Sequence, residues 1–177
     1  MLEKSQKAFW DAYVDTLAPG ELPEEPWVEA SVAGDERIAD ELLQLYLDGK
    51  KRAGSGLVAD YLAAGDPLPK IGNYWIILDG NETPRCIVRT IRVEHHLFKD
   101  ITEEVAIAEG EGDGSIAYWK QAHRTFFEPY LESFGVTDLD EAEVVTEFFE
   151  VVYHPEDSGV QKDGQKSASQ EAAKTCC

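Results

Sequence analysis

The residues of this chain best suited to chemistry lie in segment 108–115, where acidic residues alternate with glycines. Glu109, Glu111 and Asp113 are separated by single glycines, and Ser115 closes the segment. Glycine lets a backbone turn sharply or approach a ligand closely. Carboxylates accept protons and bind hard cations, so the pattern indicates a functional loop.

Two interpretations of this acidic loop remain open. The three carboxylates would suit a magnesium ion, because hard cations prefer oxygen ligands. More simply, Asp113 or Ser115 caps the helix that follows, and one glutamate acts in a site. That helix would also point free backbone N–H groups into the loop. We favour the second interpretation and predict no metal and no cofactor.

A second candidate segment is basic and rich in glycine. In segment 49–56, Lys50, Lys51 and Arg52 form the one cluster of positive charge in an acidic chain. The segment is not a P-loop, because no strand precedes it and it lacks the Gly-Lys-Ser/Thr ending. A helix C-cap explains its first glycine and the lysines, but not Gly54 and Gly56. We therefore expect this segment to form a ligand-binding loop.

Aromatic residues and a histidine follow the acidic loop at helical spacing. Tyr118, Trp119, Phe126 and Phe127 are aromatic residues of a kind that in most proteins belongs to the core. An exposed ring among them would stack on a nucleobase, and Trp119 or Tyr118 is expected to supply it. His123 lies one helical turn after Trp119. It is either a hydrogen-bonded core residue or a group that faces the same cleft.

The spacing of apolar residues divides the chain into elements. The predicted helices cover about residues 4–17, 35–50, 58–62, 102–108 and 114–134. The predicted strands cover 74–78, 85–95 and 144–153, with a hairpin turn at 79–81. In the second strand, Ile87, Ile91 and Val93 are expected to share one face. Strands and helices do not alternate regularly, which favours a compact α+β barrel over a doubly wound fold.

Charge and composition limit the classes of partner. The 177-residue chain has a formal net charge of -19, which argues against extended nonspecific DNA binding and against an anionic membrane surface. We expect an N-terminal helix and acidic connector (1–26), a folded domain (27–154) and a disordered tail (155–177). No signal peptide or bilayer-spanning run is visible, and the cysteines suit a reducing compartment, so a cytoplasmic location is expected.

Several of these motifs together resemble the ASCH (activating signal cointegrator homology) domain family. Segment 49–54 resembles its Gly-x-Lys-x-x-Thr signature. Further segments resemble one bacterial branch in order and spacing: 68–72, 109–113, Trp119 with His123, 126–127 and 149–153. The resemblance implies a PUA-like β-barrel with flanking helices, an association with RNA, and a cleft that holds the signature lysine, here Lys51.

The resemblance also implies candidate catalytic residues. Some small ASCH proteins are hydrolases, either amidohydrolases acting on N4-acylated cytidine or ribonucleases. The Lys, Thr and Glu of the amidohydrolases correspond here to Lys51, Gly54 and Glu109. Glycine replaces the threonine, and the neighbouring Ser55 would need a shifted loop to supply the hydroxyl. The catalytic candidates are therefore Lys51, Glu109 and Ser55.

Two functions follow as hypotheses, and a protein-interaction domain with an acidic surface is a third interpretation. The first is a module that recognises RNA or a modified nucleoside or nucleotide in the Lys51–Glu109 cleft, and the alternative is a hydrolase that uses the same pair. The missing threonine and the net charge favour recognition of a small ligand. The ligand-contacting residues expected are Lys50, Arg52, Gly54, Glu111, Asp113, Ser115, Tyr118, Trp119 and His123. The sequence does not specify an oligomeric state.

Overall fold

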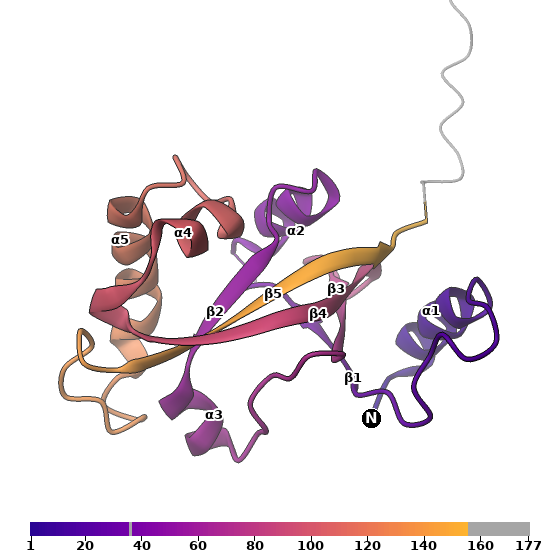
Figure 1. Cartoon of the computed structure of the whole chain (residues 1–177), viewed down its shortest axis with the longest axis horizontal. Helices are drawn as coiled ribbons and strands as arrows, with labels where there is room; N and C mark the ends of the chain where they lie inside the picture. Colours follow the sequence, from indigo (N-terminus) through magenta and orange to yellow (C-terminus); the bar gives the residue numbers. More distant parts are fainter. Residues whose placement is uncertain (36, 156–177) are drawn as a thin grey trace, which may run out of the picture.

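Two long antiparallel strands organise the fold in the computed structural model, which describes residues 1–35 and 37–155. Strands β4 (Pro84–Leu97) and β5 (Glu143–Tyr153) pair along most of their length. On one side, β3 (Tyr74–Leu78) pairs antiparallel with β4, and β1 (Val28–Val32) pairs parallel with β3. On the other side, β2 (Ala53–Leu57) pairs antiparallel with β5. The strand order is β1-β3-β4-β5-β2 (Figure 1).

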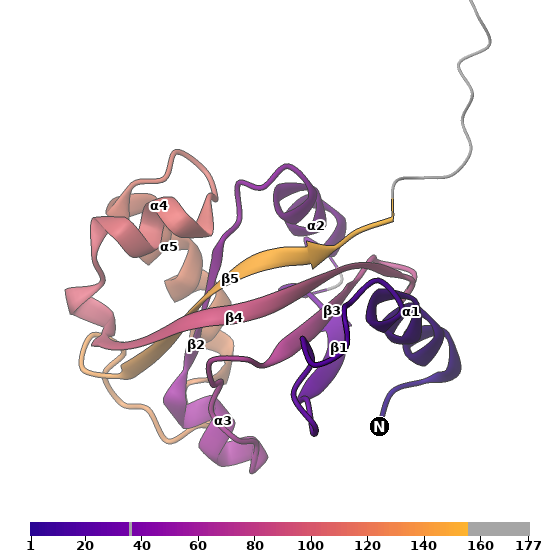
Figure 2. The same cartoon turned by 45° about the vertical axis from the view of Figure 1, so that its right-hand side comes forward.

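This mixed sheet curls into a half-barrel, and its two outermost strands, β1 and β2, remain edges. Five α-helices within the described residues flank it: α1 (Lys4–Val14), α2 (Ala39–Leu47), α3 (Val58–Ala64), α4 (Glu103–Glu109) and α5 (Ile116–Phe127). Figures 1 and 2 show α1 at the opposite end of the sheet from α4 and α5. The predicted α+β, PUA-like architecture is confirmed. The predicted tail lies outside the described residues, except for residue 155.

Side-chain alternation along the strands decides which helix covers which face. On β3, Tyr74 and Ile76 pack with α1, whereas Trp75 and Ile77 pack with α2, so these two helices cover opposite faces. At the other end of the sheet, Ala53 and Val144 pack with α4 and α5. The open edge strand β2 therefore runs between α2 and α5, and this edge is where the candidate site lies.

Two of the five strands in the described residues were not predicted from the sequence. β1 falls where no element was expected, and β2 occupies half of the segment predicted to be a ligand-binding loop. The Gly-Ser-Gly sequence of β2 has low intrinsic β-propensity. Pairing of each of its residues with β5 stabilises the strand, so tertiary contacts override the local preference.

The predicted helices 4–17, 35–50 and 114–134 are shorter in the structure. The first ends at Val14, and the second covers only Ala39–Leu47. The third ends at Phe127, and a 3-10 turn, Glu128–Tyr130, follows it. Pro129 lies in that turn and lacks the N–H group that the next helical hydrogen bond needs. The helix consequently stops there, although the apolar spacing continues.

The predicted face of β4 was wrong at Ile91. The pairing of β4 with β5 passes from Thr90 to Arg92, so Ile91 is the extra residue of a β-bulge. The bulge reverses the alternation: Thr90 is buried and Ile91 is exposed. Thr90 thereby faces inward, where it contacts Glu147.

A close backbone contact joins the two segments that carry the candidate site residues. Gly110 ends α4 with a φ of +69°, and a Cβ atom there would lie 2.4 Å from the Lys50 carbonyl oxygen. The Arg52 N–H donates to the Ala108 carbonyl at 2.7 Å. Only glycine fits this position, and the contact brings the end of α4 against the chain that enters β2.

Replacing Gly110 by alanine is therefore expected to lower the free energy of unfolding by about 3 kcal/mol or more, because a left-handed backbone and a backbone clash act together. Gly65 is the matched control, since it also ends a helix, has a φ of +75° and leaves a space of 4 Å around the place that a Cβ atom would take. Gly65→Ala should cost only about 1–2 kcal/mol. Urea denaturation measures both values. Equal losses of unfolding free energy would show that the close contact with Lys50 does not contribute to stability.

Candidate functional site

The structure places Lys51 beside Glu109, although 57 residues separate them in the sequence. Lys51 lies between α2 and β2, and Glu109 is the last residue of α4. The Lys51 Nζ atom lies 3.2 Å from Glu109 Oε2. The two residues are 4 % and 1 % exposed, so this is a buried ion pair.

Glu111 makes a second contact with the same ammonium group. Its Oε1 atom lies 2.6 Å from Lys51 Nζ, and its side chain is partly exposed. An ammonium group has three N–H donors. Two of them are directed to Glu109 and Glu111, which leaves one for a further acceptor.

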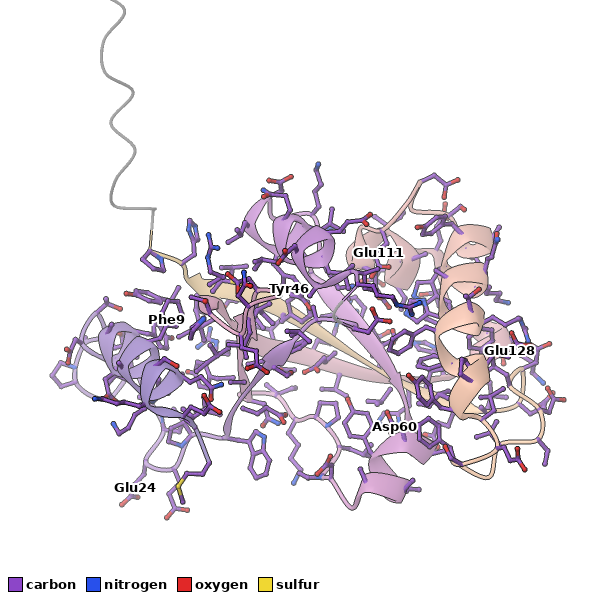
Figure 3. All side chains as sticks on the ribbon, turned by 180° about the vertical axis from the view of Figure 1, so that it is seen from behind. Phe9, Glu24, Tyr46, Asp60, Glu111 and Glu128 are labelled. Atoms are coloured by element: carbon purple, nitrogen blue, oxygen red, sulfur yellow. The ribbon has the colours of Figure 1, made fainter. Side chains whose placement is uncertain are left out.

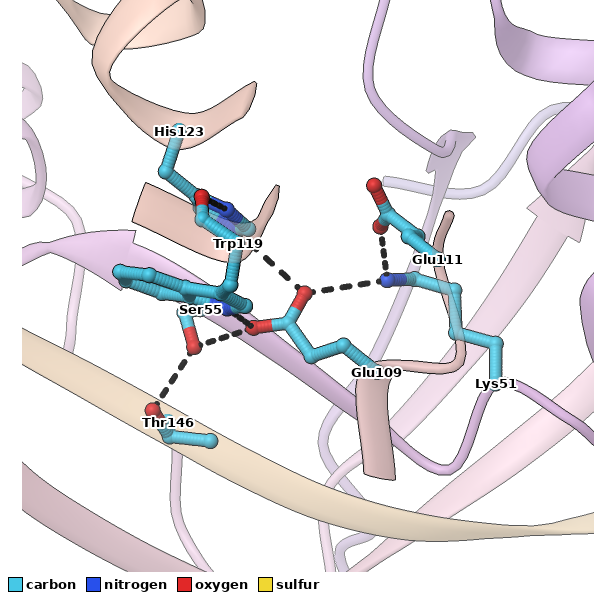
Figure 4. A network of polar contacts seen from close by, with 7 residues as sticks. All are labelled: Lys51, Ser55, Glu109, Glu111, Trp119, His123 and Thr146. Atoms are coloured by element: carbon cyan, nitrogen blue, oxygen red, sulfur yellow. Dashed lines mark hydrogen bonds and ion pairs between the residues drawn. The ribbon is translucent and has the colours of Figure 1, made fainter. Parts of the chain in front are cut away.

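Glu109 is the centre of the network drawn in Figure 4. Its Oε1 atom accepts hydrogen bonds from the Ser55 hydroxyl at 2.6 Å and from the Trp119 indole N–H at 2.7 Å. Its Oε2 atom lies 3.5 Å from His123 Nε2, in addition to the contact with Lys51. Both carboxylate oxygens are therefore occupied.

These contacts hold both members of the pair in their charged forms. Burial by itself raises the pKa of Glu109, but the charge of Lys51, together with His123 and Ser55, holds this pKa well below its usual range. Burial lowers the pKa of Lys51, but the charges of Glu109 and Glu111 more than offset this and hold it above its usual range. Neither group is poised to exchange a proton near neutral pH.

Ser55 and His123 support Glu109 from two elements. Ser55 pairs with Thr146 across β2 and β5, and their hydroxyl oxygens are 2.7 Å apart. The Ser55 hydroxyl thus reaches Glu109 without any shift of the chain. On α5, the His123 ring stacks on Trp119 with 3.9 Å between centroids. Its Nδ1 atom lies 3.0 Å from the Trp119 carbonyl oxygen, which requires a proton on Nδ1.

A cavity of about 390 Å³ follows the β2 edge beside this network. α2, α3 and α5 contribute its walls, and Figure 3 shows Glu111 near one end of β2 and Asp60 near the other. Polar and charged groups in its lining are Tyr46, Lys51, Ser55, Asp60, Tyr61, Glu109, Glu111, His123 and Glu147. The apolar lining includes Ile38, Leu42, Trp75, Phe126 and Phe127.

Four polar or charged residues of this lining were not predicted as site residues from the sequence: Tyr46, Asp60, Tyr61 and Glu147. The Tyr46 hydroxyl is the one fully buried side-chain N or O atom of the described residues that has no hydrogen-bond partner. In the predicted helix 35–50, Tyr46 falls at the spacing of the apolar residues, which is typical of a core position. Tyr61 was also assigned only to a helix, and Glu147 lay unremarked inside an apolar strand. No local pattern separates these residues from core positions.

Other residues proposed as ligand contacts lie outside the cavity. Lys50, Arg52 and Asp113 line a separate, more open hollow together with Ile107 and neighbouring glycines. Ser115 caps α5 by accepting the Tyr118 N–H. The Asp113 carboxylate accepts the Ser115 N–H, so both residues serve the start of the helix.

The two aromatic residues proposed to stack on a base are not in the cavity lining either. Trp119 is 3 % exposed, and its indole N–H is committed to Glu109. Tyr118 is 42 % exposed, and its ring covers Gly112, where a Cβ atom would lie 2.4 Å from the ring. Gly54, by contrast, lies in the lining between Ser55 and Lys51.

No group of three or more side chains suited to a metal ion occurs in the part of the chain that the structure describes. Glu109 and Glu111 both contact Lys51, and Asp113 points to its own helix. None of the helices in the described ranges has the length and apolar character needed to cross a bilayer.

Comparisons with known proteins identify the family and the fold. The family model for the ASCH domain matches residues 29–153. The chain belongs to the ASCH domain family. The crystal structure of an ASCH domain from Lactobacillus crispatus JV V101 is similar, with a TM-score of 0.81 and 29 % identity over 86 % of this chain and 97 % of that one. A protein from Enterococcus faecalis V583 has a TM-score of 0.71 and 32 % identity over 84 % and 88 %. No curated protein matches.

The buried ion pair makes a prediction for stability in this ASCH protein. Lys51→Met should lower the free energy of unfolding by about 3–5 kcal/mol, because it leaves the Glu109 charge buried without its main partner. Lys50→Met is the matched control. Lys50 is exposed and paired with Asp48 on the surface, so its loss should cost less than about 1 kcal/mol. Chemical denaturation measures the free energy of unfolding of both variants. Equal, small decreases in this free energy would contradict a buried charged pair.

The same pair predicts how stability depends on pH. The lowered pKa of Glu109 stabilises the fold above the unfolded-state value of 4.5, and this contribution is lost as pH falls below it. The raised pKa of Lys51 stabilises the fold below 10.5, and that contribution is lost as pH rises through its folded value. Urea denaturation between pH 5 and about 3 should show a shallower loss for Glu109→Gln than for wild type.

Glu104→Gln is the control for this measurement, because Glu104 is exposed and paired with Arg92 at the surface. It should retain the wild-type acid dependence. If Glu109→Gln and wild type lose stability in parallel below pH 5, Glu109 is not held in its charged form by the contacts described above.

Proposed function

We propose that this ASCH protein binds a neutral nucleoside, either free or as an unstacked residue of RNA, in the cavity along β2. The observation that carries the proposal is the Lys51 ammonium group. Two carboxylates fix it in the cavity wall, and one of its N–H donors has no partner among the described residues. A fixed donor beside aromatic side chains suits a planar ligand with a carbonyl oxygen.

The size and lining of the cavity support this ligand class. Its volume of about 390 Å³ lies in the range of small-molecule sites, which is roughly 300–1,000 Å³. Tyr61, Trp75 and Phe126 supply ring surface from three different elements. Stacking of one base on an aromatic ring contributes about 1–3 kcal/mol.

The charge of the cavity favours a neutral ligand. Asp60, Glu109, Glu111 and Glu147 contribute carboxylates to the lining, against one ammonium group and one imidazole. A phosphate inside this cavity would meet a net negative field, because the whole chain also carries a charge of -19. Phosphates of an RNA ligand would therefore remain outside, where Lys50 and Arg52 line the separate hollow.

Tyr46 supplies a second donor to the ligand. Tyr46 belongs to the cavity lining, and its hydroxyl is buried without a partner among the described residues. Such a group costs about 1–3 kcal/mol while it is unsatisfied. A ligand oxygen that accepts from Tyr46 removes this cost. Lys51 and Tyr46 thus provide two donors, one from the segment between α2 and β2 and one from the last turn of α2.

A hydrolase is the second candidate, and one observation favours it. The Ser55 hydroxyl donates to Glu109 at 2.6 Å, which is the contact expected between a nucleophile and its base. Against it, the low pKa of Glu109 makes this carboxylate a weak base, and both of its oxygens are occupied. Glycine also stands at position 54, where the amidohydrolase pattern has threonine. Recognition without turnover is therefore the first choice.

Calorimetric titration with nucleosides and their 5′-monophosphates tests the proposal. The wild type should bind at least one nucleoside, and the corresponding monophosphate should bind about tenfold more weakly because its charge is repelled. Tyr46→Phe should weaken nucleoside binding about fivefold, the effect of one hydrogen bond. Tyr130→Phe, an exposed position outside the cavity lining, should leave it unchanged. Absence of nucleoside binding, or tighter binding of the monophosphate, would contradict the proposal.

Chromatography of the same mixtures separates the two candidates. The substrates are N4-acetylcytidine and short RNAs, with and without magnesium. Binding without product supports the binding module. Product that disappears in both Ser55→Ala and Glu109→Gln, but persists in Tyr130→Phe, would establish the hydrolase instead.

A further inference from the structure

Glu147 is a carboxylate in the cavity wall without a cationic partner among the described residues. It lies on β5, and its Oε2 atom accepts a hydrogen bond from the Thr90 hydroxyl at 2.8 Å. No ion pair involving Glu147 occurs in the described ranges. Burial raises its pKa, Thr90 lowers it, and the nearby charge of Glu29 raises it further. The binding proposal above counts Glu147 only as part of the negative charge of the lining and assigns it no hydrogen bond with the ligand.

A missing side chain gives the cavity access to this carboxylate. Gly54 on the edge strand pairs directly with Glu147, and paired residues of adjacent strands project on the same face. A Cβ atom at position 54 would lie 3.7 Å from the Phe149 ring, an ordinary van der Waals contact, so a side chain would fit at this position but none is present. The next residue on this face is Gly56, against which the Tyr61 ring packs. Glu147, Gly54 and Tyr61 therefore share one part of the cavity.

We propose that Glu147 selects nucleobases that carry an exocyclic amino group, by accepting a hydrogen bond from that group. This inference rests on the proposed nucleoside binding. A carboxylate oxygen accepts an N–H donor but repels a carbonyl oxygen at the same place. The base would meet a donor at Lys51 and an acceptor at Glu147, and so must present a carbonyl oxygen and an amino group on different edges.

Position 54 has glycine where the family signature has threonine, and this difference affects access to Glu147. A threonine there would project on the face of Glu147 and stand between the carboxylate and the open edge of the sheet. Glycine removes a hydroxyl that the resemblance assigns to catalysis, and at the same time uncovers Glu147. In this chain, position 54 therefore serves ligand selection.

Two nucleoside pairs that differ in the amino group test the inference. Cytidine is compared with uridine, and guanosine with inosine, by calorimetric titration. Wild type should bind the amino-bearing member of a pair about tenfold more tightly. Glu147→Gln should reduce this preference to about twofold or less, because a carboxamide both donates and accepts. Glu150→Gln, the same change on the outer surface of β5 where Glu150 pairs with Arg89, should preserve it.

A second variant, Gly54→Thr, tests whether the ligand reaches Glu147 past position 54. Gly54→Thr should fold, as judged by thermal unfolding, and should weaken binding of the amino-bearing nucleosides more than that of their partners. Full retention of the preference in Gly54→Thr would overturn the access route through position 54.

The outcomes separate this inference from the proposed function. Binding of nucleosides by wild type without preference for the amino group overturns the role of Glu147 and leaves the binding proposal intact. That comparison needs no variant, so a folding defect in Glu147→Gln does not affect it. A preference that survives in a folded Glu147→Gln protein also overturns the inference. Absence of binding for all four nucleosides contradicts both.

Discussion

A buried ion pair between Lys51 and Glu109 is the interaction on which the rest of the site depends. Two opposite charges removed from water require close contact and additional hydrogen bonds to offset the loss of hydration. Here Ser55, Trp119 and His123 contact the carboxylate, and Glu111 contacts the ammonium group. Because each partner is needed to keep the charges compensated, β2, α4 and α5 are held in one relative position. These contacts therefore determine the shape of the cavity.

The same constraint explains where the chain uses glycine. Gly110 allows the end of α4 to approach the Lys50 carbonyl, which brings Glu109 to Lys51. Gly54 and Gly56 place no side chains on this face of the edge strand, so the Tyr61 ring packs closely against Gly56 and no side chain at position 54 covers Glu147. The cavity lining thus combines charged side chains held in place by contacts with glycine residues that have no side chain. A site built this way presents a rigid donor and a rigid acceptor, which suits recognition of a flat, neutral molecule more than movement of protons.

Much of this arrangement followed from the sequence, for reasons that can be stated. Apolar spacing and turn residues are local signals, so the fold class, the hairpin at 79–81 and the short helix near 102–108 were predicted correctly. The importance of Lys51 and Glu109 came from unusual local composition and from the resemblance to ASCH domains. Ser115 capping of α5 was one of two alternatives that the sequence offered.

The remaining features depend on contacts between distant segments. β2 exists because β5 pairs with it, and nothing in Ala53–Leu57 alone favours a strand. The bulge at Ile91, which turns Thr90 inward, comes from the pairing register. The sequence alone does not distinguish Tyr46, Tyr61 and Glu147 from ordinary core or surface residues. Only the fold places them around one cavity. Trp119 looked like a stacking platform, but its depth and its bond to Glu109 make it a support for the carboxylate.

The most direct test of the account is a crystal structure of the wild-type protein with a nucleoside at saturating concentration. We expect the base in the cavity along β2, between Tyr61 and Phe126, with a carbonyl oxygen within hydrogen-bond distance of Lys51 Nζ. A base bound in the hollow beside Lys50 and Arg52, or one in the cavity whose oxygens avoid Lys51, would contradict the claim that the fixed ammonium group is the recognition element.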